Sequence, residues 1–301
     1  MSAPALFAIC TAIWGSTWMA ITFQLGVVPP EVSVVYRFAL AAVLIGVGCV
    51  ATRRSLAFPP ATHAWLAAWG ATMFGLNYVA VYYAEAHVSS GLVAVVFATI
   101  VFMSAFGMRL FFGTPLTTRM LVAATLGVGG IALLFLPELE AARDGGQTAI
   151  GVAYAFGATV LATGGNLIAV RNHARDLPVY PTTAWGMLYG AGIAALVSIV
   201  QGVPWRFDAT PAYVASLLYL AVFGSVVAFG AYLTLLKMVG AAPASYLAVS
   251  TPVIAMLLTT LFEGYRWSWP AVLGVALALS GIVLALRKAR PAASLSPARK
   301  S

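Results

Sequence analysis

The sequence predicts an all-α integral membrane protein in which ten transmembrane helices form two inverted five-helix repeats around a central cavity. The first observation behind this prediction is composition, because 62% of the 301 residues are hydrophobic and only 8% are charged. A soluble domain carries about 25% charged residues, so a soluble fold of this length could not cover so much apolar surface. The other two observations are the spacing of the apolar runs and an internal repeat.

The apolar runs are each about 20 residues long, which is the length that a helix needs to cross a bilayer. Five of them fall near residues 4–24, 31–51, 63–84, 89–109 and 117–136. A polar segment follows at 137–147, and five more runs fall near 149–170, 179–200, 211–235, 243–262 and 269–286. Charged residues, Pro and Gly lie at the junctions and predict the connecting turns.

The basic residues fall unevenly on the two sides of these predicted helices. If the N-terminus is placed in the cytoplasm, 12 of the 16 Lys and Arg residues lie on the inner side, 3 lie on the outer side, and Arg37 lies within a helix. Cytoplasmic loops of membrane proteins carry such an excess of Lys and Arg. We therefore expect both termini in the cytoplasm. Cys10 and Cys49 then lie near cytoplasmic helix ends, where we expect buried thiols rather than a disulfide.

The internal repeat has an offset of about 151 residues, at which Gly-Ile-Ala-Leu-Leu (130–134) matches Gly-Ile-Val-Leu-Ala (281–285). Five helices per half is an odd number, so the second half must run through the membrane in the opposite sense. Inverted repeats are typical of alternating-access transporters, whose substrate site lies near the midplane; duplication without a transport role is the alternative. The predicted units are a first repeat at 1–137, an outer linker at 138–148, a second repeat at 149–287 and a basic tail at 288–301.

Several aromatic and polar side chains of the first half are candidates for the substrate pathway. Trp14 and Trp18 are one helical turn apart and could line a cavity, with ordinary packing between helices as the alternative. Tyr78 and Tyr82 also share a helix face, and a Tyr hydroxyl in hydrocarbon needs a polar partner, which favours an inward position. Asn77 beside them suits either a substrate contact or a bond between helices.

The remaining pathway candidates are small polar side chains near the middle of predicted helices, with one tyrosine: Thr99, Thr163, Asn166, Tyr246, Ser250 and Thr251. Ser and Thr also bond back to carbonyls of their own helix, which is the alternative for them. Pro252 removes a backbone hydrogen bond in the ninth helix, so we expect a kink there with a role in gating. Small residues four apart, such as Ala123 with Gly127 and Gly274 with Ala278, predict close helix packing within the monomer.

Arg37 lies inside an apolar run, where a permanent positive charge costs roughly 3 kcal/mol on insertion scales. Two interpretations stay open at this point. The side chain could extend outward along the helix and pair with Glu31 or Glu85. Alternatively, it could bind a substrate carboxylate or hold an outer gate closed.

The chain resembles the EamA-type drug/metabolite transporters, which are ten-helix metabolite exporters of bacteria, over about residues 4–287. It is also loosely similar to the aromatic-amino-acid exporters of that group. The resemblance rests on short motifs in both halves, namely Trp14-Gly15-Ser16, Arg37-Phe38, Tyr82-Tyr83-Ala84, Ser89-Ser90-Gly91-Leu92, Pro243-Ala244-Ser245, Thr251-Pro252 and Phe262-Glu263-Gly264. The chain departs from the family at Ile100, where Pro is common, and near Gly113, where an acidic residue is usual. The resemblance implies a multi-pass protein of the bacterial inner membrane.

We predict a transporter that exports small metabolites from the cytoplasm by alternating access, rather than an enzyme. Aromatic walls, few polar groups and one cation suit amino acids, aromatic or otherwise neutral, whereas sugar phosphates would need several cations. Efflux of drugs or other hydrophobic solutes is the first alternative. A membrane enzyme is the second, and the scarcity of paired catalytic groups at membrane depth argues against it.

The expected partners are the small-molecule substrate and the lipid bilayer. We expect no cofactor, no metal and no nucleic acid. A monomer is expected, with a homodimer as the alternative. Because no Asp or Glu lies at the membrane midplane, a facilitator without proton coupling is expected. A relay at the outer end through Glu85 and His87 is the competing account.

Overall fold

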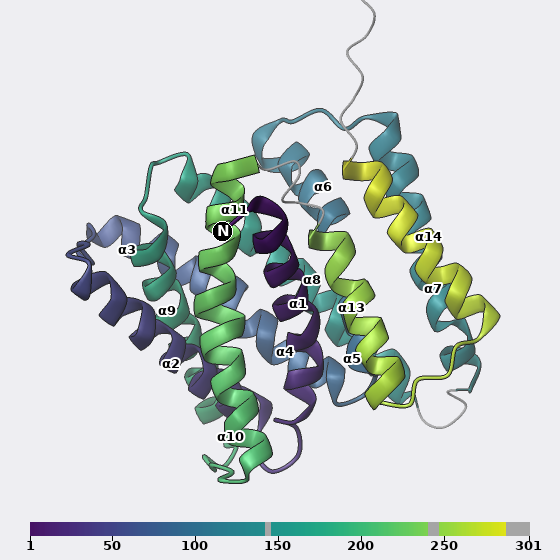
Figure 1. The fold of residues 1–301 in the computed structure, drawn as a ribbon, viewed down its shortest axis with the longest axis horizontal. Coiled ribbons are helices and arrows are strands. Elements are labelled where there is room, and N and C mark those ends of the chain that lie inside the picture. The colour runs from purple at the N-terminus through teal and green to yellow at the C-terminus, as the bar shows by residue number, and fades with distance from the viewer. Residues whose placement is uncertain (142–145, 240–246, 287–301) are drawn as a thin grey trace, which may run out of the picture.

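The computed structural model describes residues 1–141, 146–239 and 247–286, and all regular structure in these ranges is helical (Figure 1). The first half contains α1 (Ala3–Thr22), α2 (Pro30–Ala51), a third segment of α3 (Pro60–Gly70), η1 (Ala71–Gly75) and α4 (Leu76–Glu85), a fourth of α5 (Ser90–Phe97) and α6 (Ile100–Phe112), and α7 (Thr118–Ala141). The second half contains α8 (Gln147–His173), α9 (Val179–Val200), a segment of α10 (Pro211–Leu218), η2 (Tyr219–Val227) and α11 (Ala228–Val239), then α13 (Leu247–Phe262) and α14 (Trp269–Leu286).

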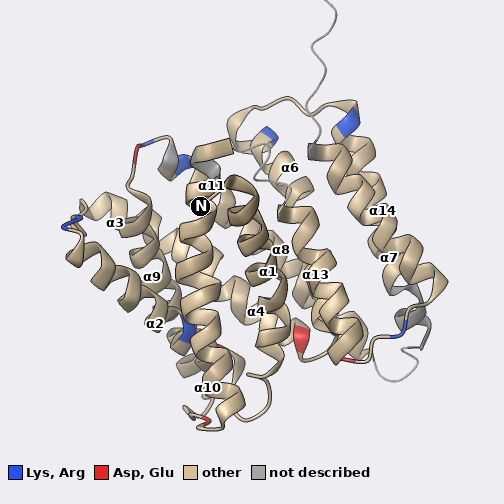
Figure 2. Cartoon of the chain, in the orientation of Figure 1, with Lys and Arg blue, Asp and Glu red and all other residues tan. Residues whose placement is uncertain are grey.

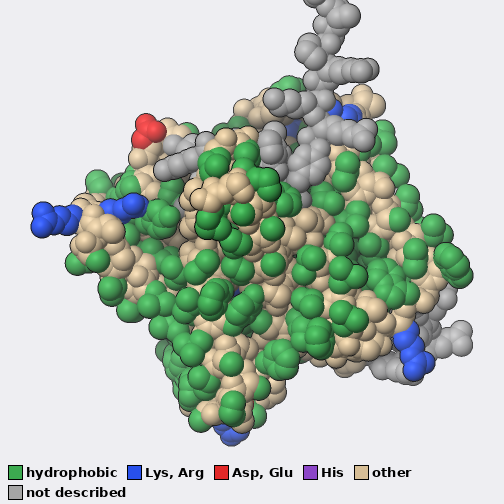
Figure 3. Space-filling view, in the orientation of Figure 1, with side chains coloured by type: hydrophobic (Ala, Val, Ile, Leu, Met, Phe, Trp, Pro, Cys, Tyr) green, Lys and Arg blue, Asp and Glu red, His purple; other side chains and the backbone are tan. Residues whose placement is uncertain are grey.

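The helices suit a bilayer in length and composition. Within the described residues, seven helical segments are long and apolar enough to cross a membrane, and three shorter apolar helices lie at Thr118–Leu134, Leu247–Phe262 and Trp269–Ala285. Helical segments therefore overlap the apolar runs identified in the sequence, with residues 243–246 of the ninth run lying outside the described residues. The face drawn in Figure 3 is largely hydrophobic, and its charged atoms lie towards the edges of the molecule. Large apolar side chains are exposed on the surface, among them Leu110, which is 78% exposed, and such an apolar surface suits contact with lipid.

Local sequence signals explain where several helices begin and end. Proline occupies the first turn of α2, α3 and α10, where a missing N–H removes no helical hydrogen bond. The helix α6 ends at Gly113, whose φ of +72° lies in the left-handed region. The amide of Gly113 donates to the carbonyl of Arg109, and the amide of Thr114 donates to that of Met108, so the last carbonyls are satisfied.

Two π-helical segments interrupt the third segment of the first half and the corresponding segment of the second half. They are η1, at Ala71–Gly75, and η2, at Tyr219–Val227. In η2 the Ser225 hydroxyl donates to the Leu220 carbonyl at 3.0 Å, which satisfies one of the displaced backbone groups. Single π-helical turns are rare in α-helices and are frequent at functional sites.

The packing of the helices follows a simple pattern. The helix α7 lies along α14, and α2 lies along α9. In the interior, α1 packs against α13 and α11, while α8 packs against α4, α5 and α6. The contact of α7 with α14 is close, because a Cβ added at Gly130 would lie 2.5 Å from the backbone nitrogen of Ala278. The predicted tight packing of small residues within the monomer is therefore confirmed.

The charges divide between the two ends of the molecule. In Figure 2 most Lys and Arg lie towards the end that carries the N-terminus, while most acidic residues lie towards the opposite end, where α4 and α13 end. This is the division expected from the sequence, although the orientation in a membrane stays a prediction. Cys10 and Cys49 are both free and buried, as expected.

Candidate functional site

A set of buried polar side chains gathers where α1, α4 and α13 end and where α2 and α5 begin. We call it the polar cluster; its members, all at most 7% exposed, are Gln24, Glu31, Arg37, Tyr82, Glu85, Ser90 and Thr259. They come from segments far apart in the sequence, which the helix packing brings to one end of the molecule (Figure 1). Polar groups are expensive to bury in a membrane protein, so such a cluster is the natural candidate for a functional site.

Arg37 is the largest member and is only 2% exposed. Its guanidinium carbon lies 4.5 Å from the ring centroid of Tyr78 and 5.0 Å from that of Phe38. Two of its nitrogens, Nε and Nη1, have no hydrogen-bond partner. Within the described residues no carboxylate lies within ion-pair distance of it, so the interpretation in which Arg37 extends outward and pairs with Glu31 or Glu85 is wrong. Cation–π contacts of about 2 kcal/mol each compensate only part of the cost of burying this charge.

Glu85 is the second unpaired charge of the polar cluster. It is 7% exposed, and neither of its carboxylate oxygens has a hydrogen-bond partner. Its electrostatic neighbours are Glu263 and Arg37. An ionised carboxylate buried in this way costs several kcal/mol, so this group needs a proton or a bound cation to become stable. Glu85 lies at a predicted outer helix end in the sequence, and its burial could not be predicted there, because hydropathy reports position along a helix and not the neighbours of that helix.

Two neighbouring tyrosines hold the other polar groups in place. The Tyr82 hydroxyl donates to Gln24 Oε1 at 2.5 Å and also lies against Arg37. The Tyr83 hydroxyl donates to Glu31. The inward position predicted for Tyr82 is therefore the position that it takes in the structure. Tyr78 is inward as well, since its ring packs on Arg37.

The start of α5 is capped by side chains at the C-terminal end of α13, from Thr259 and from Glu263, the first residue after the helix. We call this set of contacts the α5–α13 latch; its residues are Ser90, Gly91, Thr259 and Glu263. The Ser90 amide donates to Glu263 Oε2 at 3.0 Å, and the Gly91 amide donates to Thr259 Oγ1 at 2.9 Å. The Ser90 hydroxyl contacts Thr259 Oγ1 at 3.0 Å and donates to Glu263. These amides have no acceptor within their own helix, so the latch ties the two halves of the chain together.

The predicted tryptophans pack between helices rather than around an open space. Trp14 lies 5.6 Å from Phe229 and 5.4 Å from Tyr232 between ring centroids, and its indole N–H donates to the Gly224 carbonyl at 3.2 Å. Trp18 lies 5.3 Å from Phe97. Both side chains are only partly buried. Two cavities, one between the start of α3 and the end of α8 and one near the end of α2, are lined by none of the predicted pathway residues. A central cavity stays a prediction.

The small polar candidates divide into two groups. Asn166 contacts Ser104 at 3.5 Å, and Ser250 contacts Thr11 at 2.9 Å, so both join neighbouring helices. The hydroxyls that donate instead to carbonyls of their own helix are those of Thr99, Thr163 and Thr251. These three follow the alternative stated for them, because their donors are already used.

The other three predicted residues differ from one another. Asn77 is buried and donates to the Met73 carbonyl at 3.0 Å, while its Oδ1 has no partner. Pro252 lies buried inside α13, and the helix continues through it; its role in gating is a prediction. Tyr246 lies outside the described residues. Within those residues, no group of three His, Cys, Asp or Glu side chains is suited to a metal ion.

Comparison with known proteins places this architecture in a family. The model of the EamA-like transporter family matches residues 1–136 and again 149–287. The chain is 30% identical to an uncharacterized inner membrane transporter, YedA, of Escherichia coli K12, covering 93% of this chain and 89% of YedA. It is 23% identical to the protein PagO of Salmonella typhimurium, covering 95% and 93%, and 26% identical to the protein PecM of Dickeya dadantii, covering 93% and 90%.

A solved crystal structure has the same fold. Its TM-score to this chain is 0.64 at 18% sequence identity, with 94% of this chain and 96% of that chain covered. The family model spans nearly all of the helical chain and matches each half separately. The chain therefore belongs to the EamA-like transporter family.

Proposed function

We propose that this chain is an inner-membrane exporter of amino acids, aromatic or otherwise neutral, that works by alternating access. Its ten helical segments would cross the membrane as two inverted repeats, with both termini in the cytoplasm. Transport follows from family membership, and the inner-membrane location is supported by the name of the relative YedA. The observation that carries the choice of substrate is the pair of buried ionisable side chains Arg37 and Glu85, in which Arg37 Nε and Nη1 and both Glu85 oxygens have no hydrogen-bond partner.

The proposed inverted repeat is supported by the packing of the helices. In the proposed repeat α1 corresponds to α8, and α13 corresponds to the segment of α5 and α6. The contact of α1 with α13 therefore has its counterpart in the contact of α8 with α5 and α6. Likewise α11 corresponds to α4, so the contact of α1 with α11 has its counterpart in the contact of α8 with α4. The helices α2 and α9 correspond to each other and pack together, as do α7 and α14. The segments η1 and η2 also correspond to each other. The family model matches at 1–136 and 149–287, close to the proposed units 1–137 and 149–287.

An amino acid carries a carboxylate and an ammonium group on one carbon, and the polar cluster offers a partner for each. The Nε and Nη1 groups of Arg37 have no hydrogen-bond partner, so each has N–H donors available for the oxygens of a substrate carboxylate. The unpartnered oxygens of Glu85 suit an ammonium group. The rings of Tyr78 and Phe38 beside Arg37 provide apolar surface for the substrate side chain.

The burial of these groups suggests a state that is closed at this end. Arg37 and Glu85 are covered, and the α5–α13 latch joins helices of the two halves at the same end of the molecule. In alternating access, the substrate would reach such a site from the other end or after the latch opens. Hydrophobic-solute efflux is the alternative, and it requires no pair of opposite charges.

The test uses proteoliposomes and three labelled compounds, namely phenylalanine, N-acetylphenylalanine, which lacks the ammonium group, and phenethylamine, which lacks the carboxylate. We expect counterflow of phenylalanine at least about tenfold faster than of either analogue, since one unpaired buried charge costs more than 1.4 kcal/mol. Arg37→Gln and Glu85→Gln should each abolish most of this preference. Arg206, which is exposed, and Asp208, which is half-buried, lie outside the polar cluster and provide matched controls as Arg206→Gln and Asp208→Asn. Equal transport of all three compounds, unchanged in both variants, would favour hydrophobic-solute efflux.

A further inference from the structure

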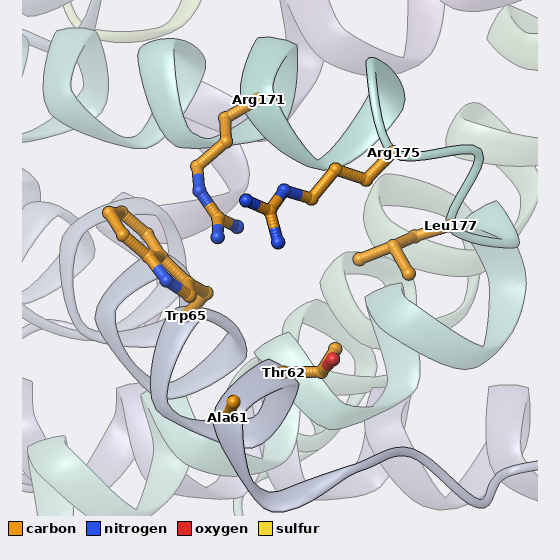
Figure 4. A pocket seen from close by; sticks show the side chains of 6 residues that line it. All are labelled: Ala61, Thr62, Trp65, Arg171, Arg175 and Leu177. Atoms are coloured by element: carbon orange, nitrogen blue, oxygen red, sulfur yellow. The ribbon is translucent and has the colours of Figure 1, made fainter.

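Two arginines, Arg171 and Arg175, line a cavity at the opposite end of the molecule from the polar cluster. The cavity has a volume of about 280 Å³ and lies between the first turns of α3 and the end of α8. Its lining consists of Ala61, Thr62, Trp65, Arg171, Arg175 and Leu177 (Figure 4). None of these residues takes part in the proposed substrate site, so a role for this cavity does not depend on the proposed substrate.

The two guanidinium groups converge on this space. Figure 4 shows the side chains of Arg171 and Arg175 extending from the end of α8 towards the same opening, and they repel one another. Arg171 stacks on Trp65, with 3.7 Å from its guanidinium carbon to the ring centroid, and contacts Asn172 Oδ1 at 3.3 Å. Within the described part of the chain neither arginine forms an ion pair, although Asp176 is adjacent in sequence. Two like charges are thus held together without a counter-ion.

The opposite wall of the cavity also suits an anion. Ala61 and Thr62 belong to the first turn of α3, whose N-cap residue, Pro59, provides no side-chain cap. Pro60 has no N–H, and the amides of Thr62 and His63 donate to the Pro59 carbonyl, so this helix start offers the Ala61 N–H together with the partial positive charge of a helix N-terminus. The Thr62 hydroxyl faces the cavity from the same turn (Figure 4). The cavity therefore combines two cations, a hydroxyl donor and a helix N-terminus around one space, and no acidic side chain lines it among the residues that the structure describes.

We propose that this cavity binds the phosphate group of an anionic phospholipid. Guanidinium groups bind phosphate oxygens through paired hydrogen bonds, and two of them match a phosphodiester better than a single carboxylate. The cavity is slightly smaller than a site for a drug-sized ligand, which suits a headgroup phosphate. It also lies at the end of the molecule where Lys and Arg gather (Figure 2). Trp65, at 42% exposure, is placed as an aromatic residue of the membrane interface.

The physical reason to choose a lipid over a soluble ligand is the position of the cavity. Basic pockets between transmembrane helices on the cytoplasmic side attract anionic lipid headgroups, which are concentrated in that leaflet. A soluble phosphate ester presents the same chemical group without this local concentration. The two sources can be separated, because only the lipid is part of the bilayer.

The experiment uses the purified full chain in nanodiscs of phosphatidylcholine alone, with added phosphatidylglycerol, or with inorganic phosphate in the buffer. Retained phosphatidylglycerol is counted by native mass spectrometry, and thermal unfolding is recorded in parallel. The variants are Arg175→Gln and the double variant Arg171→Gln/Arg175→Gln. The matched control is Arg53→Gln, which removes the same charge from an exposed position at the end of α2.

We expect the double variant to bind phosphatidylglycerol at least about tenfold more weakly than the wild type, with a smaller loss in Arg175→Gln and none in Arg53→Gln. The rise in unfolding temperature caused by phosphatidylglycerol should fall in the same order. Wild-type affinity in the double variant would overturn the proposal. So would an arginine-dependent effect of inorganic phosphate equal to that of the lipid, since the ligand would then be soluble phosphate. Arg175 is exposed and forms no ion pair in the described structure, so the single variant should fold normally.

Discussion

The α5–α13 latch leads to a prediction about the closed end of the molecule that can be worked out in magnitude. The Ser90 hydroxyl touches both Thr259 and Glu263, and at least one of these contacts is charge-assisted. The substitution Ser90→Ala removes this hydroxyl and its contact with Glu263. It should destabilise the latched state by about 1.5–3 kcal/mol, which is the range for hydrogen bonds to charged groups. At 1.4 kcal/mol per factor of ten, the opening equilibrium should shift by roughly 10–150-fold.

Hydrogen–deuterium exchange of the chain in nanodiscs measures this shift directly. The amides of Ser90 and Gly91 lie in the first turn of α5, where no acceptor within the helix protects them. Their protection in this structure comes from Thr259 of α13 and from Glu263 directly after it, so their exchange rate reports the opening of the latch. We expect exchange at this turn to become faster in Ser90→Ala by the factor given above.

The neighbouring Ser89 provides the matched control. It is the N-cap residue of α5, yet its side chain makes no capping hydrogen bond, and its buried Oγ has no partner. Ser89→Ala removes the same group one residue earlier and should leave exchange at the first turn of α5 nearly unchanged. If both variants exchange equally fast, or neither differs from the wild type, the latch does not hold this end closed and the reasoning is refuted.

Two further predictions concern packing and orientation. A Cβ at Gly130 would lie 2.5 Å from the backbone of α14, whereas one at Gly129 would meet nothing within 4 Å. Thermal unfolding in detergent should therefore show Gly130→Ala to be less stable by about 1–3 kcal/mol and Gly129→Ala to be neutral or up to about 1 kcal/mol more stable; equal stability would contradict the close contact of α7 with α14. Reporter fusions should place Ser301 in the cytoplasm and Gly145 outside, as the uneven distribution of Lys and Arg predicts. A periplasmic Ser301 would reverse the proposed orientation.

The sequence alone was sufficient for the properties that depend on local composition. The apolar runs predicted the helical segments, because a helix satisfies its backbone hydrogen bonds internally whatever its neighbours are. Small residues four apart in the runs at 117–136 and 269–286 predicted close helix packing, since they allow two backbones to approach, and the structure showed that α7 and α14 are each other's partners. Short family motifs around Trp14, Arg37 and Ser90 predicted the family, which the family model confirms.

The polar cluster required the tertiary structure. Glu85 and Glu263 are both helix-end residues in the sequence, yet one is buried without a partner and the other caps α5 from 173 residues away. Periodicity also left open whether Thr163 and Thr251 face a substrate, and their bonds to their own helices follow from side-chain geometry. Hydropathy and spacing describe one helix at a time, whereas the state of a buried charge depends on which other helices surround it. That is why the sequence determined the family and the helices, and only the packing decided that Arg37 and Glu85 are buried with Arg37 Nε and Nη1 and both Glu85 oxygens lacking hydrogen-bond partners.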